Sequence, residues 1–466
     1  MTDSKDYFFC GIGGSGMLPL AMIVKARGAH VEGSDRALDQ GRTGAKFDYL
    51  RSLGIALHAQ DGSGVTRPSQ ILVASAAVED TVPDVAAAKA AGAARLSRAE
   101  LLAQLFNESE CPIGVAGTSG KSTTTGMIGW ILHHAGQKTD KSPTVMNGAV
   151  MKNFVKPDAL FASALVGEGE AFVSEVDESD GSIAMFRPKV SVLNNISLDH
   201  KSMEELRALF GGFIGHAQTA VLNLDNDETA ALASVRKDGK LTYSLQDKSA
   251  DLFADNIEPQ PFGVSFDVVT KDESARVSLK MPGRHNVSNA LAAMAAASAC
   301  GVSLKDAAKA LADFEGVKRR LEFVGEAKGV TVIDDFGHNP DKITASLKTL
   351  HEFPGRLLVM FQPHGFGPLR LMKNEFIATF ADHLSEDDIL LMPEPVYFGG
   401  TVDRSVSSKD IAAGIVAAGR KAEALATRDD CGARLLRLAR PGDRIVIMGA
   451  RDDTLSVFAA DLLKQL

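Results

Sequence analysis

Residues 114–123 have the composition of a loop that holds the phosphates of a nucleotide. They read Gly-Val-Ala-Gly-Thr-Ser-Gly-Lys-Ser-Thr, after an apolar run and before a helix-like run. Glycines let backbone N–H groups converge on phosphate oxygens, and the N-terminus of the following helix favours negative charge. Lys121 would reach the outer phosphates, and the hydroxyl of Ser122 or Thr123 would hold Mg²⁺. Position 115 is Val where the strict pattern has Gly, yet strand, loop and helix together favour ATP or GTP over a structural turn.

A second glycine-rich segment, residues 11–16, reads Gly-Ile-Gly-Gly-Ser-Gly between a strand-like and a helix-like run. Asp35 follows about 20 residues later, where an acid that binds a ribose lies in dinucleotide-binding domains. Taken alone, this pattern favours a dinucleotide and therefore an NAD-dependent enzyme, but a second phosphate loop does not fit a simple dehydrogenase. The glycines thus predict a diphosphate or a ribose at a helix N-terminus without specifying the nucleotide, and a purely structural turn is the alternative.

Polar residues follow several other strand-like segments, at the sheet edge where parallel α/β proteins bind ligands. Glu175, Asp177, Glu178 and Asp180 could offer hard oxygen ligands to a metal that bridges phosphates, although at most one or two can reach it. The others would cap the next helix or face solvent. The same placement at a strand end is expected for Asp199-His200, for residues 334–340 and for residues 361–364.

Residues 281–289 read Met-Pro-Gly-Arg-His-Asn-Val-Ser-Asn and precede an alanine-rich helix over 290–297. Polar side chains that face the start of this helix could contact a base or a ribose. The alternative is that Asn286 or Ser288 caps the helix.

Strand-like and helix-like runs alternate almost throughout the chain, which is typical of parallel sheets with crossover helices. At about 150 residues per domain, the length of 466 residues suggests three domains. We expect an α/β fold with a Rossmann-like N-terminal domain over 1–107, a central phosphate-loop ATPase domain over 108–315 and a Rossmann-like C-terminal domain over 316–466. Polar and apolar residues alternate over 251–279, which predicts an antiparallel appendage.

The composition excludes several classes of protein. A net charge of −9 argues against nucleic acid or an anionic membrane as a partner. No apolar run approaches the roughly 20 residues needed to span a bilayer, and the charged N-terminus argues against a signal peptide, so a cytoplasmic protein is expected. The cysteines are widely separated and lack metal-ligand spacing, which predicts buried, reduced and inert thiols. They are Cys10, Cys111, Cys300 and Cys431.

Taken together, these segments resemble those of the Mur ligases over nearly the whole chain, and most closely those of the alanine-adding members. In the first two expected domains the similarity lies in residues 11–17, 33–35, 117–123, 175–180, Asn195-Ile196 with Asp199-His200, and 282–286. In the third expected domain it lies in Arg319-Arg320, 334–338 and 361–364.

The resemblance implies ATP-dependent amide synthesis in three domains. The first would bind the UDP portion of a UDP-N-acetylmuramate-type substrate, the second ATP, and the third the amino acid. In the family, the muramyl carboxylate attacks the γ-phosphate of ATP to give an acyl phosphate, and the incoming amine then displaces phosphate. Because two anions must approach each other, Lys121 and Mg²⁺ would neutralise the charge that develops.

The resemblance also assigns roles to individual residues. The catalytic residues would be Lys121, Glu178, His200, Asp335 and His338. ATP would be bound by Gly117, Thr118, Ser119, Gly120, Lys121, Ser122, Thr123, His285, Asn289, Arg320 and Asp334. Mg²⁺ would be held by Ser122, Glu178 and His200. The UDP-sugar would be bound by Gly13, Gly14, Ser15, Gly16, Asp35 and Ser75, and the amino acid by His364 and Arg370.

The chain departs from the family pattern at several positions. Several Mur ligases carry a carbamylated lysine beyond the Asp-His pair, but residues 209–214 contain no lysine, as in the alanine-adding members. Those members have an arginine directly after the residue that matches His364 and another three residues later, where this chain has Gly365 and Pro368. Neither can grip a carboxylate as arginine does. Smaller departures are Ser119 in the phosphate loop, Asn339 after His338, and residues 201–203.

The predicted function is an ATP-dependent ligase that joins L-alanine, or a related amine, to the carboxylate of UDP-N-acetylmuramate in peptidoglycan precursor synthesis. One alternative is a Mur-type ligase that attaches a different amino acid or a recycled peptide. The other is a non-catalytic paralogue that binds UDP-sugar and ATP, against which the intact Lys121, Glu178 and His200 argue.

Overall fold

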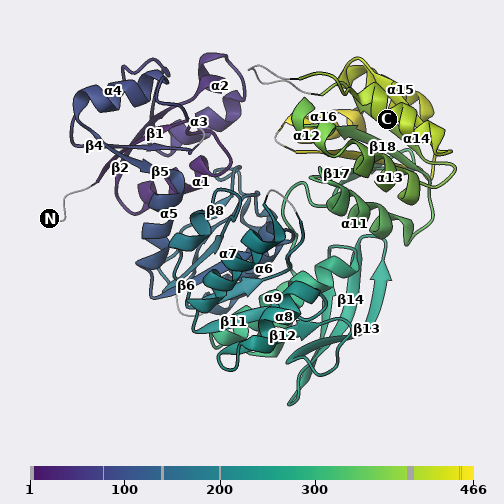
Figure 1. The fold of residues 1–466 in the computed structure, drawn as a ribbon, viewed down its shortest axis with the longest axis horizontal. Helices are drawn as coiled ribbons and strands as arrows, with labels where there is room; N and C mark the ends of the chain where they lie inside the picture. The colour runs from purple at the N-terminus through teal and green to yellow at the C-terminus, as the bar shows by residue number, and fades with distance from the viewer. Residues whose placement is uncertain are drawn as a thin grey trace. The chain divides into compact units, whose positions relative to one another are not determined.

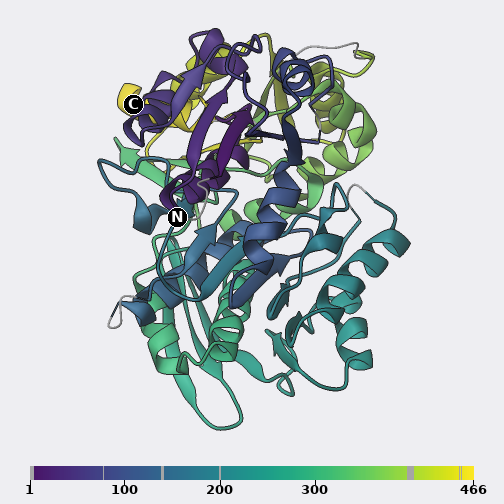
Figure 2. The ribbon, with the colours of Figure 1, turned by 90° about the vertical axis from the view of Figure 1, so that its left-hand side faces the viewer.

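The computed structural model describes residues 5–76, 78–137, 141–198, 201–395, 403–450, 452 and 454–466. Each of its sheets is built from one continuous part of the chain, so each occupies one part of the colour range in Figures 1 and 2. The chain forms two compact units, the first of residues 1–258, 265–280 and 286–317, and the second of residues 259–264, 281–285 and 318–466. Among the described residues, no helix is both long and apolar enough to cross a bilayer.

The N-terminal sheet has the strand order β3-β2-β1-β4-β5, and every strand pair in it is parallel. The strands are β1 Asp6–Cys10, β2 His30–Ser34, β3 Ala56–His58, β4 Gln70–Ala74 and β5 Ala94–Ser97. The helices are α1 Met17–Ala26, α2 Arg36–Asp39, α3 Gly44–Ser52, α4 Pro83–Ala91 and α5 Arg98–Asn107. The first glycine segment therefore connects β1 to α1, as its motif predicted.

The second sheet has the order β15-β14-β13-β12-β11-β10-β6-β9-β7-β8. Its strands are β6 Cys111–Ala116, β7 Thr144–Met146, β8 Ala164–Leu165, β9 Ala171–Glu175, β10 Val190–Leu193, β11 Thr219–Asn223, β12 Lys240–Ser244, β13 Leu252–Gln260, β14 Gly263–Val269 and β15 Ser274–Leu279. Its helices are α6 Lys121–Gly136, α7 Met203–Gly215, α8 Asp227–Val235, α9 Arg284–Ala299 and α10 Leu304–Ala312, with short 3₁₀ turns η1 Lys152–Phe154 and η2 Ser182–Met185. The predicted appendage continues this sheet, because β13 pairs with β12 in parallel. The turn from β13 to β14 is too short for a parallel crossover, so these two neighbouring strands run antiparallel.

The third sheet has the order β16-β17-β21-β18-β19-β20 and is parallel except for β16, which pairs with β17 in antiparallel fashion. Its strands are β16 Glu322–Ala327, β17 Val330–Asp335, β18 Leu357–Gln362, β19 Ile389–Pro393, β20 Lys421–Leu425 and β21 Arg444–Gly449. Its helices are α11 Pro340–His351, α12 Phe366–Leu371, α13 Lys373–His383, α14 Ser408–Ala417, α15 Arg428–Leu438 and α16 Thr454–Gln465.

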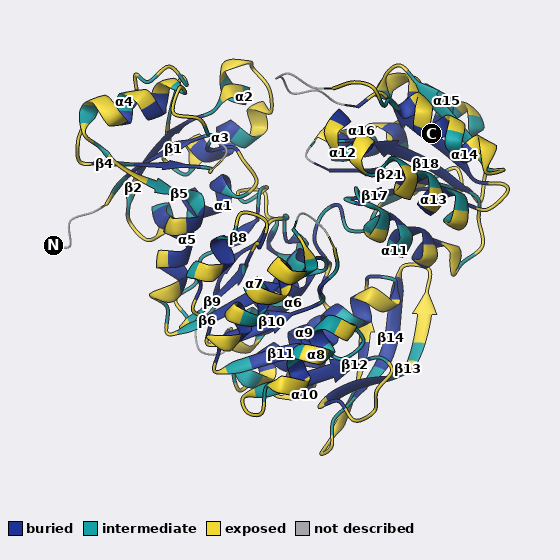
Figure 3. Cartoon of the chain, in the orientation of Figure 1, coloured by how far each residue is buried: buried dark blue, intermediate teal, exposed yellow. Residues whose placement is uncertain are grey.

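Alternate side chains of the central strands pack against helices on both faces of a sheet. In β1, Tyr7 and Phe9 belong to one apolar cluster with α1 and α5, whereas Phe8 packs in another with Val85 and Ala88 of α4. Burial on both faces explains why these strands read as continuous apolar runs. Figure 3 shows the result, with most inner strands buried and the outer faces of the helices exposed. The α/β fold with parallel sheets is thus confirmed, whereas the exact domain bounds remain a prediction.

Candidate active site

The phosphate loop connects β6 to α6 and needs glycine at two positions. Gly117 and Gly120 have φ angles of +127° and +81°, which L side chains rarely adopt. A Cβ atom on Gly120 would also lie 2.5 Å from Oδ1 of Asn289 and 2.7 Å from Nδ2 of Asn194. The loop backbone therefore approaches amide side chains more closely than any other residue type would permit.

Lys121, the first residue of α6, folds back over this loop. Its Nζ donates to the carbonyl of Gly117 at 2.6 Å and lies 3.2 Å from Oε2 of Glu178. Only 18% of the Lys121 side chain and 5% of the Glu178 side chain are exposed. The sequence placed both residues at the site, and the structure brings them into a largely buried ion pair.

Two asparagines that follow β10 form hydrogen bonds with the loop, and sequence reasoning gave them no role. Oδ1 of Asn195 accepts from the backbone N–H of Ser119 at 2.9 Å, and its Nδ2 donates to Oγ of Ser119 at 3.0 Å. Asn194 donates from Nδ2 to Oγ1 of Thr124 at 3.0 Å. The available signal was their position at the polar end of a strand-like run, the same signal that identified Glu178.

The four carboxylates at and after the end of β9 have different partners. Oε1 of Glu175 accepts from the N–H of Gly148 at 2.6 Å, and Oδ1 of Asp180 accepts from the N–H of Ser182 at the start of η2. Burial would raise the pKa of Asp177, but the charge of Lys121 and the N–H of Ser179 hold that pKa below its usual value. Among them, Glu178 is the one that pairs with the phosphate-loop lysine.

Helix α9 begins at Arg284, earlier than predicted. Asn286 and Ser288 therefore lie inside the helix, and the alternative that one of them caps it is wrong. Oδ1 of Asn289 accepts from Oγ1 of Thr124 at 3.3 Å, which places this side chain at the phosphate loop. His285 lies exposed in the first turn. Asp199 and His200 lie outside the described residues.

The first glycine segment is organised by Asp35. Oδ2 of Asp35 accepts from the N–H of Gly13 at 2.8 Å, while Oδ1 accepts from the N–H of Ala37 and caps α2. Lys46 donates from Nζ to the carbonyl of Gly13 at 3.1 Å. Both oxygens of the predicted ribose acid thus already hold backbone groups. Gly14, Ser15 and Gly16 continue the turn into α1, and Ser75 follows β4 at the same edge of the sheet.

Replacing Asp35 with alanine should weaken UDP-sugar binding about 10- to 100-fold, because the backbone around Gly13 loses a charged acceptor. ATP binding should not change. Calorimetric titration with UDP-N-acetylmuramate and, separately, with ATP measures both affinities, and Asp48→Ala serves as a control on a carboxylate that is 74% exposed. A variant that bound ATP more weakly but kept its UDP-sugar affinity would refute the assignment of this loop.

Asp334 and Asp335, at the end of β17, are buried and already hydrogen-bonded. Asp334 lies 3.4 Å from Nε of Arg319 and accepts from Ser456 at 2.7 Å, and burial raises its pKa although Arg319 opposes that rise. Asp335 accepts from the N–H groups of Leu321 and Gly337 and from the hydroxyl of Ser346. In this structure these carboxylates shape the loop that presents His338.

His338 and His364, from two different strand ends, lie together with their ring centroids 5.4 Å apart. Nδ1 of His338 lies 2.9 Å from the carbonyl of Phe336, so this nitrogen carries the proton and Nε2 keeps its lone pair. Burial and the charge of Lys342 lower the pKa of His338 to about 3, against the effect of the Phe336 bond. His338 is therefore neutral at physiological pH.

Two arginines predicted for this domain lie in different settings. The guanidinium of Arg320 lies 4.6 Å from the ring centroid of Phe336, which is two residues before His338 in the chain. Arg370 is exposed on α12 and pairs with Asp403 at 2.7 Å. Gly365 has a φ of +151° and a ψ of 159°, a conformation essentially restricted to glycine. An arginine cannot occupy position 365 without a different backbone.

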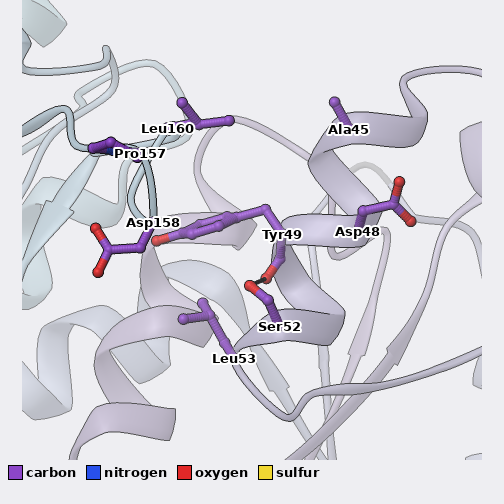
Figure 4. Close-up of a pocket in the computed structure, with 8 residues that line it drawn as sticks. All are labelled: Ala45, Asp48, Tyr49, Ser52, Leu53, Pro157, Asp158 and Leu160. Carbon is purple, nitrogen blue, oxygen red and sulfur yellow. Dashed lines mark hydrogen bonds between the residues drawn. The ribbon is translucent and has the colours of Figure 1, made fainter.

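A separate pocket of about 630 Å³ lies between α3 and residues 157–160 (Figure 4). The ring of Tyr49 lies in it, 5.6 Å from that of Phe161, and burial together with the charge of Asp158 raises the pKa of Tyr49. All eight lining residues differ from the predicted site residues. The pocket is thus formed by other side chains than the nucleotide-binding loops.

Comparison with known proteins identifies three consecutive family matches. The Mur ligase family catalytic domain matches residues 6–110, the Mur ligase middle domain residues 115–297, and the Mur ligase glutamate ligase domain residues 319–451. The UDP-N-acetylmuramate–L-alanine ligase of Agrobacterium fabrum is 36% identical, over 96% of this chain and 94% of its own length. That of Caldicellulosiruptor bescii is 33% identical, over 96% of each chain.

Solved structures share the three-domain fold. The UDP-N-acetylmuramate-alanine ligase of Thermotoga maritima superposes with a TM-score of 0.78 at 24% identity, covering 99% of this chain and 98% of its own. A murein peptide ligase of Psychrobacter arcticus has a TM-score of 0.71 at 24% identity, with the same coverage. These likenesses establish the fold, and the curated relatives match almost the entire sequence. The chain therefore belongs to the Mur ligase family and is an ATP-dependent ligase.

Proposed function

We propose that this ligase joins L-alanine to the carboxylate of UDP-N-acetylmuramate in peptidoglycan precursor synthesis. The observation that carries the proposal is the Lys121–Glu178 pair on a phosphate loop with two left-handed glycines. Curated relatives named UDP-N-acetylmuramate–L-alanine ligase, with 33–36% identity, support the choice of substrates. A chain that had lost ligase activity would have no need to keep this buried pair.

Lys121 would leave Glu178 for the phosphates when ATP enters the loop. Its ammonium then neutralises charge on the transferred phosphoryl group while the muramyl carboxylate attacks and ADP departs. The acyl phosphate that results gives the carbonyl a good leaving group, and the amine displaces phosphate from it. Asn194 and Asn195 hold the loop backbone in place during both steps.

The oxygens of Ser122 and Glu178 fit Mg²⁺, which prefers hard oxygen donors. The Ser122 side chain is buried in the turn that starts α6, and Glu178 is 4% exposed. His200, by its resemblance to the family motif, would complete the set. When bound, the metal offsets charge on the phosphates.

In the C-terminal domain, we assign amine binding to the neutral His338 and its neighbour His364. Nε2 of His338 is available to accept a hydrogen bond from the amine, because Nδ1 is held by the Phe336 carbonyl. Asp335 positions this histidine through the N–H of Gly337. A low pKa keeps the imidazole uncharged, so it does not repel a protonated amine as it arrives.

The amino acid's carboxylate needs a cation that Gly365 and Pro368 cannot supply. We assign this role to Lys342 of α11, whose charge lowers the pKa of His338, as does the charge of Arg320. Lys342→Ala should raise KM for the amino acid about 10-fold and change kcat little, because a charged hydrogen bond is lost. Steady-state kinetics measure this, with exposed Lys348→Ala on the same helix as the control. Equal KM values for the two variants would exclude Lys342.

Phosphate release from ATP and Mg²⁺ with UDP-N-acetylmuramate tests the whole proposal across a panel of amino acids and short peptides. Release should depend on L-alanine, and the sugar nucleotide should gain the mass of one alanyl residue. Release with a recycled peptide instead would make the altered segment 365–368 a change of specificity. If no amine caused phosphate release although both nucleotides bound, ligation of this acid would be excluded.

A further inference from the structure

Cys111 and Cys300 lie side by side and are not fully buried, contrary to the expectation for all four thiols. Their Sγ atoms are 3.8 Å apart although the residues are 189 positions apart in the chain. Both are partly exposed, whereas Cys10 and Cys431 are buried, and all four are free thiols. We propose that Cys111 and Cys300 form a peroxide-oxidised disulfide site within one chain.

The neighbourhood of Cys111 favours a reactive thiolate. The hydrogen bond with Cys300 and the charge of Lys189 lower the pKa of Cys111, although burial opposes this. The same interaction raises the pKa of Cys300. Burial raises the pKa of Cys10 and of Cys431 to about 12. The pair thus has one sulfur suited to attack and a second one 3.8 Å away that can resolve the product.

Oxidation needs only a peroxide as co-reactant. The Cys111 thiolate attacks one peroxide oxygen, the O–O bond breaks, and a sulfenic acid forms while hydroxide leaves. Cys300 loses its proton and its sulfur attacks the sulfenic sulfur. The S–S bond forms, the S–O bond breaks, and water leaves. With hydrogen peroxide, two thiols lose two electrons and the oxidant becomes two molecules of water.

The position of the pair defines what the bond would do. Cys111 is the first residue of β6, at the strand end opposite the phosphate loop, and Cys300 directly follows α9. A bond here would tie that helix, which carries Asn289, to β6 in the interior of the sheet. Because it would close a very long loop and lie away from the nucleotide, it should raise the thermal midpoint by about 5 °C. ATP affinity should be unchanged.

Treatment of the full chain with hydrogen peroxide, followed by intact mass measurement under denaturing conditions, tests the site. The mass should fall by two hydrogen atoms, and non-reducing peptide mapping should recover Cys111 linked to Cys300. Cys111→Ser and Cys300→Ser should each abolish that loss, whereas a Cys10→Ser, Cys431→Ser variant should keep it. Four free thiols after treatment, oxygen retained on Cys111, or a disulfide between chains would each overturn the proposal. Peptide mapping of the peroxide-treated wild-type chain identifies the linked cysteines even where a variant folds poorly.

Discussion

Lys121→Ala should abolish measurable turnover, with a loss of at least about 1000-fold in kcat. The ammonium that now lies 2.6 Å from the Gly117 carbonyl and 3.2 Å from Glu178 is the cation that α6 offers to the phosphates. Without it, two anions must react with their developing charge unopposed. Phosphate release with saturating ATP, UDP-N-acetylmuramate and L-alanine measures the loss.

Removal of Lys121 also leaves Glu178 buried without its partner, so the variant needs a test of folding. Its circular dichroism spectrum and thermal midpoint should be compared with those of Lys121→Arg, which keeps a charge but not the compact ammonium. Lys141→Ala is the matched control, because that lysine is 63% exposed and pairs with Glu170. Activity within 10-fold of the wild type in a folded Lys121→Ala variant would exclude the assigned role.

The phosphate loop could be predicted because its chemistry depends on neighbouring residues. Residues 117–123 contain the glycines, the lysine and the hydroxyls in one stretch, and the strand and helix that flank them have their own local signals. Strands β17, β18, β19 and β21 also carry a local signal, since burial on both faces gives continuous apolar runs. The edge strands β16 and β20 are only partly buried and lack that signal.

Contacts between distant segments could not be predicted. Asn195 braces Ser119 across 76 positions in the chain, and the two cysteines meet across 189, so nothing in the local sequence relates them. The motif also does not reveal the role of Asp335. This acid lies at a strand end, as a ligand would, but it accepts hydrogen bonds from two N–H groups and a hydroxyl of the protein. A strand-end acid has the same sequence whether it binds substrate or shapes the loop that does.

Arg319→Met should destabilise the C-terminal unit by about 3–5 kcal/mol, because it leaves Asp334 as a buried charge without its partner. Arg319 is 7% exposed, lies 3.4 Å from Asp334 and donates to the carbonyls of Gly449 and Asp452. Arg370→Met is the matched control in the same unit, since Arg370 and Asp403 are both about half exposed. That change should cost about 1 kcal/mol or less. Urea denaturation of both variants measures the difference.

The deficit of Arg319→Met should shrink as the pH falls, and the sign follows from Asp334. Burial already raises the pKa of this acid in the folded state, and loss of Arg319 removes the charge that opposes the rise. Between the pKa of Asp334 in the unfolded chain and its higher pKa in the folded variant, the folded variant holds a proton that the unfolded chain releases. The stability of the variant relative to the wild type therefore falls as pH rises through this range. Denaturation at about pH 5 and about pH 8 should show the larger deficit at the higher pH. The further change Asp334→Asn in the same chain should recover part of it, and an equal deficit in the single and double variants would show that Arg319 stabilises the domain without reference to this charge.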